Sequence, residues 1–299
     1  MARTATQDRI GEGLWLFESG RPGPAVAISF GVHGDERPPI DAGLALAGEL
    51  EKDARPLRRG RVLLVFGNPR AASEGTRWSK GGIDLNRCFH ADVLARTPEL
   101  HEEHRSREIV AALGRSQVEV LVDFHCTVEP GRRFLMHHPP VEEPEHRRIR
   151  ELLSAEVLLS DPELHFGSVS LDEWMSTRSK VGICYETGWM NDPENTPERV
   201  LSEMKNLLRG LELLAGDARS YAEKQLLELD SLVRCDGEGF AWRAGVGENL
   251  QALAAGTKIG AYADGRQVVL ERDATLIFPK KKPELVQRGK PLVYLARRR

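Results

Sequence analysis

The chain has 299 residues, 40% of them hydrophobic, and its 42 basic and 45 acidic residues leave a formal net charge of −3. This composition is typical of a globular protein with one large domain, or with a large domain and a small companion, and it argues against disorder. The near balance of charge gives no sign of a nucleic-acid partner.

The pattern of apolar residues and cysteines bears on the compartment. The first residues contain no apolar segment of signal-peptide length, and no apolar run is long enough to span a bilayer. The four cysteines lack a Cys-x-x-Cys pair, which fits reduced and buried thiols better than disulfides. We therefore expect a cytoplasmic protein without a membrane partner. Cys126 is a conceivable soft metal ligand, but a packed thiol is the favoured interpretation.

Short apolar runs alternate with helical periodicity over the first two thirds of the chain. Strands are predicted at 25–30, 62–66, 118–124, 134–136, 157–159 and 181–186. Helices are predicted at 40–52, 97–113, 145–153 and 196–214. This alternation predicts an α/β fold with a mixed, mostly parallel sheet flanked by helices. The charged residues of the second helix, among them Glu102, Glu103 and Arg105, are expected to form a solvated face.

The C-terminal part has a different sequence pattern, in which frequent glycines separate short apolar runs from about residue 231 onward. We expect a catalytic α/β domain over 1–228 and a small all-β barrel or sandwich over 229–299, in which 256–260 and 289–293 repeat one turn-and-strand element. The small unit resembles a biotinyl/lipoyl carrier, but its expected central turn at 263–266 lacks a lysine, so a carrier role is not expected. Lys280, Lys281 and Lys282 are predicted to be a solvated face.

A glycine-flanked His-x-x-Glu, His33 to Glu36, follows the first predicted strand, and His125 follows the third. Imidazole and carboxylate groups suit zinc, and ligands gather at the carboxyl ends of strands in open α/β sheets. His33, Glu36 and His125 are therefore the candidate zinc ligands, with Asp123 as an acceptor for a ligand histidine.

Two further groups point to chemistry at the same edge of the sheet. Glu186 ends another apolar strand, where a carboxylate beside an activated water can serve as general base. The segment 67–89 is predicted to be a long functional loop, and its Arg77 and Arg87 suggest an anionic substrate because arginine binds carboxylates through two donors.

These motifs, in their order along the chain, resemble those of the succinylglutamate desuccinylase and aspartoacylase family, which are zinc enzymes related to the carboxypeptidase A fold. The matching segments are 33–36, Asn68-Pro69, 76–78, 84–89, 123–127 and 185–188. A small C-terminal β domain is also typical of that family. The segment between Arg77 and Asp84 looks longer than is usual there, and the stretch after His125 differs as well.

The resemblance implies a role for each matching residue. His33, Glu36 and His125 would bind one zinc ion per chain, Glu186 would be the general base, Arg77 would polarise the scissile carbonyl, and Asn86 with Arg87 would hold a substrate carboxylate. The implied reaction is cleavage of the amide of a small anionic N-acyl amino acid by zinc-activated water.

Two alternatives stay open at this stage. One is a metallocarboxypeptidase acting on peptides, and the other is a catalytically silent metal- or ligand-binding protein. The residues do not determine the acyl group, the amine half, or whether the chain forms a homo-oligomer. Nor do they determine whether His137, His138, His165 or Arg178 border the pocket.

Overall fold

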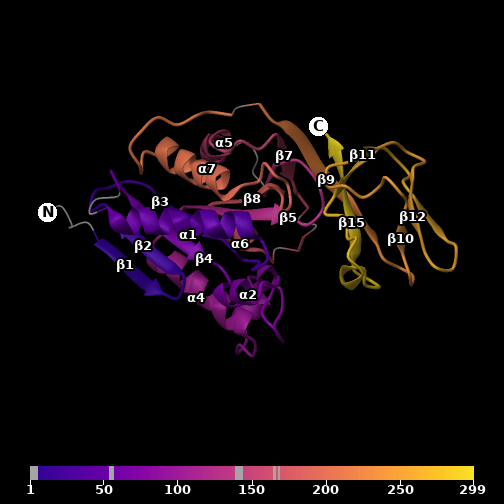
Figure 1. Ribbon diagram of the computed structural model, residues 1–299, viewed down its shortest axis with the longest axis horizontal. Coiled ribbons are helices and arrows are strands. Elements are labelled where there is room, and N and C mark those ends of the chain that lie inside the picture. The colour runs from indigo at the N-terminus through magenta and orange to yellow at the C-terminus, as the bar shows by residue number, and fades with distance from the viewer. Residues whose placement is uncertain (1–5, 54–56, 139–143, 164–165, 168, 222) are drawn as a thin grey trace.

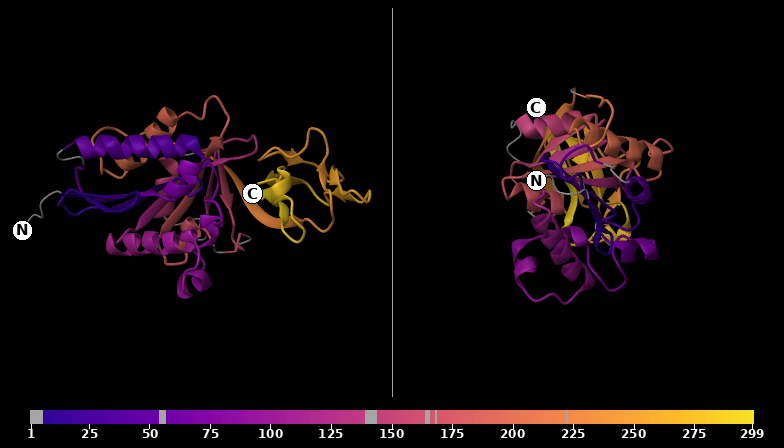
Figure 2. Two further views of the ribbon diagram at one scale, coloured as in Figure 1. Left: turned by 60° about the horizontal axis from the view of Figure 1, so that its bottom comes forward. Right: turned by 90° about the vertical axis from the view of Figure 1, so that its left-hand side faces the viewer.

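The computed structural model describes residues 6–53, 57–138, 144–163, 166–167, 169–221 and 223–299. Most strands belong to one large sheet, which helices cover on both faces, and the C-terminal strands extend beyond one end of this α/β part (Figures 1 and 2). The α/β fold predicted from the sequence is confirmed. In the described part, no helix has the length and apolar character needed to cross a membrane.

The strands are short, and most of those in the α/β part are fully buried. They are β1 Thr6–Gly11, β2 Leu14–Glu18, β3 Ala25–Phe30, β4 Arg61–Phe66, β5 Val120–Thr127, β6 Phe134–His137, β7 Val157–Ser160, β8 Val181–Trp189, β9 Gln225–Arg234, β10 Ala241–Trp242, β11 Ala252–Leu253, β12 Lys258–Ala261, β13 Gln267–Val269, β14 Ala274–Ile277 and β15 Pro291–Arg298.

The helices lie mainly between the strands of the first two thirds. They are α1 Arg37–Lys52, α2 Pro69–Glu74, α3 Ala91–Ala95, α4 His101–Arg115, α5 Pro144–Glu151, α6 Leu171–Ser176 and α7 Pro197–Gly210, with 3-10 turns at Leu85–Arg87 and Pro283–Leu285. Proline within the first two positions begins α1, α2 and α7, where its missing N–H costs nothing.

The large sheet has the order β1-β2-β4-β3-β5-β8-β6-β7-β9-β15-β14-β11. The pairs from β4 through β3 and β5 to β8 are parallel, so the carboxyl ends of β3, β5 and β8 lie side by side. β6 runs antiparallel to β8, and β7 returns parallel to β6. The candidate residues that end β3, β5 and β8 therefore share one edge.

Two apolar clusters bury the two faces of the sheet. One joins the strands to α1 and α7, through residues such as Leu46 and Leu207. The other joins them to α4 and α6, through residues such as Ile109 and Leu171. Burial of these side chains, at about 25 cal/mol per Å² of apolar surface, is the main force that fixes the sheet between its helices.

The C-terminal β-rich part continues the large sheet. β9 pairs with β7 through Gln225 to Glu228 and with β15 over most of its length, so one strand spans the predicted boundary at 228/229. A separate sheet, β10-β12-β13, lies beyond it. Gly256 and Gly289 both have positive φ and each precedes a strand by two residues, as the proposed repeat requires. The division into two domains stays a prediction.

Some local predictions were wrong. The hairpin of β1 and β2 was not anticipated, and the segment 67–89 contains α2 and a 3-10 turn as well as loop. The expected solvated face of the second helix is also incorrect at three positions, because Glu102, Glu103 and Arg105 of α4 are buried. Glu103 Oε2 accepts from Glu99 N at 2.7 Å, Arg105 Nε donates to the Gly67 carbonyl at 2.8 Å, and the partners of Glu102 are described below.

Candidate metal centre and active site

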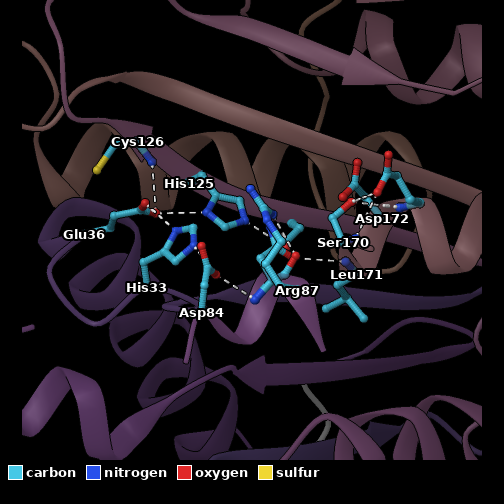
Figure 3. Close-up of polar contacts among 12 residues, drawn as sticks. His33, Glu36, Asp84, Arg87, His125, Cys126, Ser170, Leu171 and Asp172 are labelled. Carbon is cyan, nitrogen blue, oxygen red and sulfur yellow. Dashed lines mark hydrogen bonds and ion pairs between the residues drawn. The ribbon is translucent and has the colours of Figure 1, made fainter. Parts of the chain in front are cut away.

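Two histidines from different strand ends face one carboxylate. His33 Nδ1 lies 2.7 Å from Glu36 Oε1, and His125 Nδ1 lies 3.0 Å from Glu36 Oε2. All three side chains are buried, and each offers a ligand atom within 4.8 Å of those of the other two. The structure thus brings together the three residues that the sequence named as zinc ligands (Figure 3).

The turn that carries His33 and Glu36 depends on close backbone packing. β3 ends at Phe30, and the turn leads directly into α1, which begins at Arg37. A Cβ on Gly34 would lie 2.2 Å from the backbone of Ala71 in α2, so only glycine allows this approach. The Gly34 N–H also donates to the Arg77 carbonyl at 3.2 Å, which ties the turn to the loop that carries Arg77.

Two aspartates orient the histidines from behind. Asp84 Oδ1 lies 3.1 Å from His33 Nε2, and Asp123 Oδ2 lies 2.9 Å from His125 Nε2. Metal-binding histidines commonly donate their second ring N–H to such a carboxylate, which leaves the other nitrogen for the ion. The sequence had suggested Asp123 for this position. It missed Asp84, because the partner histidine is 51 residues away.

The electrostatics of the group favour positive charge. Burial lowers the pKa of His125, but Asp123 and Glu36 outweigh burial and raise that pKa well above its usual value. Burial and the charge of Arg77 lower the pKa of His33, but Glu36 and Asp84 outweigh them, so this pKa is also raised above its usual value. A divalent cation can replace the two protons that these imidazoles would otherwise hold, so the donor set fits such an ion.

Glu186 lies beside this group on the neighbouring strand. β5 and β8 are parallel with His125 opposite Glu186, and Glu186 Oε2 is buried without a hydrogen-bond partner among the described residues. Burial, together with the charge of Glu36, raises the pKa of the Glu186 carboxyl to about 7 despite the opposing effect of His125. A carboxyl group with this pKa can take up and release a proton near neutral pH.

Arginine side chains approach the same group from the 67–89 segment. Arg77 is partly buried, with Nη1 3.6 Å from Glu36 Oε1 and Nη2 3.5 Å from Asp84 Oδ2. Arg87 is exposed, and its Nη1 donates to the Asn86 carbonyl at 2.8 Å. The guanidinium group of Arg87 has no carboxylate partner among the described residues, so it is available to an anion.

Asn86 is held from the side of α6. The side-chain Oδ1 of Asn86 accepts a hydrogen bond from the backbone N–H of Leu171 at 3.1 Å. The backbone N–H of Asn86 donates to Asp84 Oδ1 at 2.9 Å. The Asn86 side-chain amide N–H group has no partner among the described residues. Asn86 therefore has a fixed orientation and retains donors for a ligand (Figure 3 shows Leu171 beside Arg87).

Glu102 of α4 organises the segment that carries Arg77 and Asp84. Its Oε1 accepts from Asn68 Nδ2 at 3.1 Å and from Ser79 N at 3.0 Å, as well as from the Ser79 hydroxyl. Its Oε2 accepts from Ile83 N at 3.3 Å. These donors explain why a charged residue is buried here, since backbone N–H groups of an irregular segment need acceptors.

Replacing Glu102 by glutamine is expected to lower the free energy of unfolding by about 2 kcal/mol, because one charge-assisted acceptor becomes an N–H group that opposes Ile83 N. Loosening of the loop should also weaken substrate turnover. Urea unfolding measures the first effect. The matched control is Glu99→Gln, an exposed glutamate just before the same helix, and equal stability of the two variants would contradict the role given to Glu102.

Lys280 corrects another expectation from the sequence. Lys281 and Lys282 are exposed as predicted, but Lys280 is half-buried, with Nζ 5.7 Å from the centre of the Phe278 ring. Burial and the charges of Arg77 and Arg87 lower the pKa of its ammonium group to about 8, so Lys280 is within electrostatic range of the two arginines. Sequence patterning could not reveal this, because Lys280 comes from the C-terminal part of the chain.

Several other candidates lie elsewhere. Cys126 contributes its backbone N–H to Glu36 Oε2 at 3.2 Å, and burial raises the pKa of its thiol, as expected for a packed cysteine. Arg178 stacks on Trp174 and lines a cavity of about 540 Å³ at the amino ends of the strands, away from His33. His137 and His138 are buried near α6 and β7, and His165 lies outside the described residues.

Fold and site together define an α/β protein with a candidate metal centre at the carboxyl ends of its parallel strands. A family model described as the succinylglutamate desuccinylase/aspartoacylase catalytic domain matches residues 22–161. The matched residues are slightly less than half of the chain, and over them the resemblance seen in the motifs is confirmed.

Individual relatives agree with this result. A succinylglutamate desuccinylase from Burkholderia orbicola is 39% identical over 107 residues, which is 34% of this chain and only 30% of that relative. A succinylglutamate desuccinylase structure from Vibrio parahaemolyticus has a TM-score of 0.78 at 15% identity and covers 99% of this chain and 91% of its own. Murine aminoacylase 3 gives a TM-score of 0.71 at 18% identity, with 93% and 96% covered. At these identities the two structures establish the fold alone.

Proposed function

We propose that this protein is a zinc-dependent hydrolase that cleaves the amide bond of a small anionic N-acyl amino acid. The observation that carries the proposal is the buried group of His33, Glu36 and His125 with the Glu186 carboxylate beside it, whose Oε2 has no partner among the described residues. The match of residues 22–161 to the family model and the cationic groups next to the site support the same substrate class.

His33, Glu36 and His125 would hold the zinc ion, with Asp84 and Asp123 fixing the two imidazole rings. Their donor atoms are the nitrogens and carboxylate oxygens that catalytic zinc sites use. Zinc held there would activate water and polarise the amide carbonyl.

The chain's own groups account for the proton transfers and the charge. Glu186 accepts a proton from the attacking water, and the same carboxyl then delivers it to the amine nitrogen as the amide bond breaks. Arg77 stabilises the negative charge that develops on the carbonyl oxygen. Asn86 and Arg87 bind a substrate carboxylate, through the amide donors of the former and the guanidinium fork of the latter.

Replacing Lys280 by glutamine is expected to raise KM about tenfold with little change in kcat, because its ammonium would pair with a substrate anion beside Arg87. In the wild type, KM should rise above a pH of about 8, since the amine loses its charge as pH increases through its pKa. Initial rates against substrate concentration measure both effects. Lys282→Gln, at an exposed lysine, is the matched control, and an equal response of the two variants would remove Lys280 from the site.

The proposed function is tested by a hydrolysis screen of the zinc-loaded protein. The panel contains succinyl, acetyl and longer N-acyl amino acids together with short peptides that have a free C-terminus. Turnover of one or more N-acyl amino acids is expected. Activity on peptides alone would instead identify a metallocarboxypeptidase, and zinc binding without hydrolysis of any member would identify a silent binding protein.

A further inference from the structure

A second buried group of ligand-type side chains lies outside the site described above. His138 follows β6, Asp161 follows β7, and Glu173 lies in the first turn of α6. Their exposed fractions are 3%, 2% and 1%, and each offers a ligand atom within 4.8 Å of those of the other two. Because β6 and β7 are parallel with His137 opposite Ser160, His138 and Asp161 leave the sheet side by side.

Each of these residues is held at one end by the protein. His138 Nε2 lies 3.1 Å from Asp172 Oδ2. Glu173 Oε2 accepts from Val169 N at 2.7 Å and from Ser170 N and Oγ at 2.9 Å each. Asp161 Oδ2 accepts from Phe166 N at 3.2 Å. The contacts of His138 and Glu173 fix the directions in which His138 Nδ1 and Glu173 Oε1 point.

The other ends of His138 and Glu173 are left without partners. His138 Nδ1 and Glu173 Oε1 are 4.0 Å apart, and neither has a hydrogen-bond partner in the described part of the chain. Two buried polar atoms at this distance need an explanation. In a tetrahedral zinc site with bonds of about 2.0–2.2 Å, neighbouring ligand atoms lie about 3.3–3.6 Å apart, so the two atoms would have to approach each other by about half an ångström.

We propose that His138, Asp161 and Glu173 form a second divalent-cation site that binds zinc inside the protein. A neutral imidazole and two carboxylates balance the charge of a divalent ion, and Asp172 holds the outer ring nitrogen of His138 as carboxylates do behind zinc-binding histidines.

The place of this site in the fold indicates a structural role. Glu173 holds the start of α6, whose Leu171 N–H fixes Asn86 Oδ1, and Val169 accepts the N–H of Phe89 at 3.2 Å. In Figure 3, Ser170, Leu171 and Asp172 lie beside Arg87, on the side away from Glu36. A cation at Glu173 would therefore stabilise the segment that positions Asn86, whatever substrate the first site accepts.

Zinc content per chain tests the proposal on the full-length protein after zinc loading and dialysis. Wild type should retain two equivalents. His138→Gln should retain one, His33→Gln should retain the other, and the double variant should retain none. His104→Gln, at an exposed histidine outside both groups, should keep two. A folded His138→Gln variant that retains as much zinc as wild type would overturn the proposal.

Anomalous scattering at the zinc absorption edge, from crystals of the wild-type protein, tests the site without any substitution. A peak between His138 and Glu173 is expected, in addition to one at His33 and His125. The absence of that peak from zinc-loaded crystals, or a second peak at another place, would refute the site and leave His138 as an imidazolium paired with the carboxylates.

Discussion

Replacing Glu186 by glutamine is expected to lower kcat by about 10²- to 10⁴-fold, the range that a general acid–base group contributes. Glutamine has the same size but cannot accept the proton of the attacking water. Glu186 does not belong to the group of three ligand-type residues, so zinc content should not change. Circular dichroism and elemental analysis verify that fold and metal are retained, and initial rates give kcat.

The pH dependence of turnover supplies an independent measure of the same residue. Only the ionised carboxylate accepts a proton, so kcat should rise with pH and level off above the pKa of Glu186, which burial raises to about 7. A bound divalent cation favours the ionised form, so this limb is expected at about pH 7 or below. The limb should be missing from the residual activity of the glutamine variant.

Glu194→Gln is the matched control, since Glu194 is exposed and not part of the group. Wild-type turnover in Glu186→Gln, or an unaltered acidic limb in its pH profile, would exclude Glu186 as the base. The general base would then have to be another group at the same edge of the sheet.

Replacing His125 by alanine is expected to remove the zinc ion of the first site and reduce amide hydrolysis to background. His125 has carboxylates at both ring nitrogens, Glu36 at 3.0 Å and Asp123 at 2.9 Å, and its loss removes the imidazole partner of each, although Glu36 keeps His33. Removing one member of such a buried group costs about 3–5 kcal/mol, so lower thermal stability is expected as well.

Elemental analysis should show a loss of one zinc equivalent per chain, and His33→Ala should give the same loss. His104→Ala, at an exposed histidine, controls for the substitution itself. Full zinc content in His125→Ala would show that the metal is held elsewhere. Because protons compete for the imidazole nitrogens, zinc affinity in the wild type should also fall as pH decreases.

The α/β architecture and the main site residues follow from local sequence features. Continuous apolar runs such as 25–30 and 181–186 predict buried strands, because only side chains covered on both faces of a sheet can all be apolar. Ligands bind where parallel strands end, so the strand-end positions of His33, Glu36, His125 and Glu186 are enough to predict that they share one site. The structure places the first three within 4.8 Å of one another.

Tertiary structure alone decided the contacts between distant segments. The sequence predicted that the charged side chains of α4 are exposed to solvent. Helical periodicity cannot show that backbone N–H groups of a distant irregular loop donate to the Glu102 carboxylate. Lys280 resembled part of a surface run in the sequence, but the fold half-buries it within electrostatic range of Arg87.

The same holds for the group of His138, Asp161 and Glu173, whose members follow two strands and begin a helix. Sequence determined which residues could be buried and where strands end, because both depend on neighbours along the chain. Which polar groups meet inside depends on strand order and helix packing, and these are set by the whole fold.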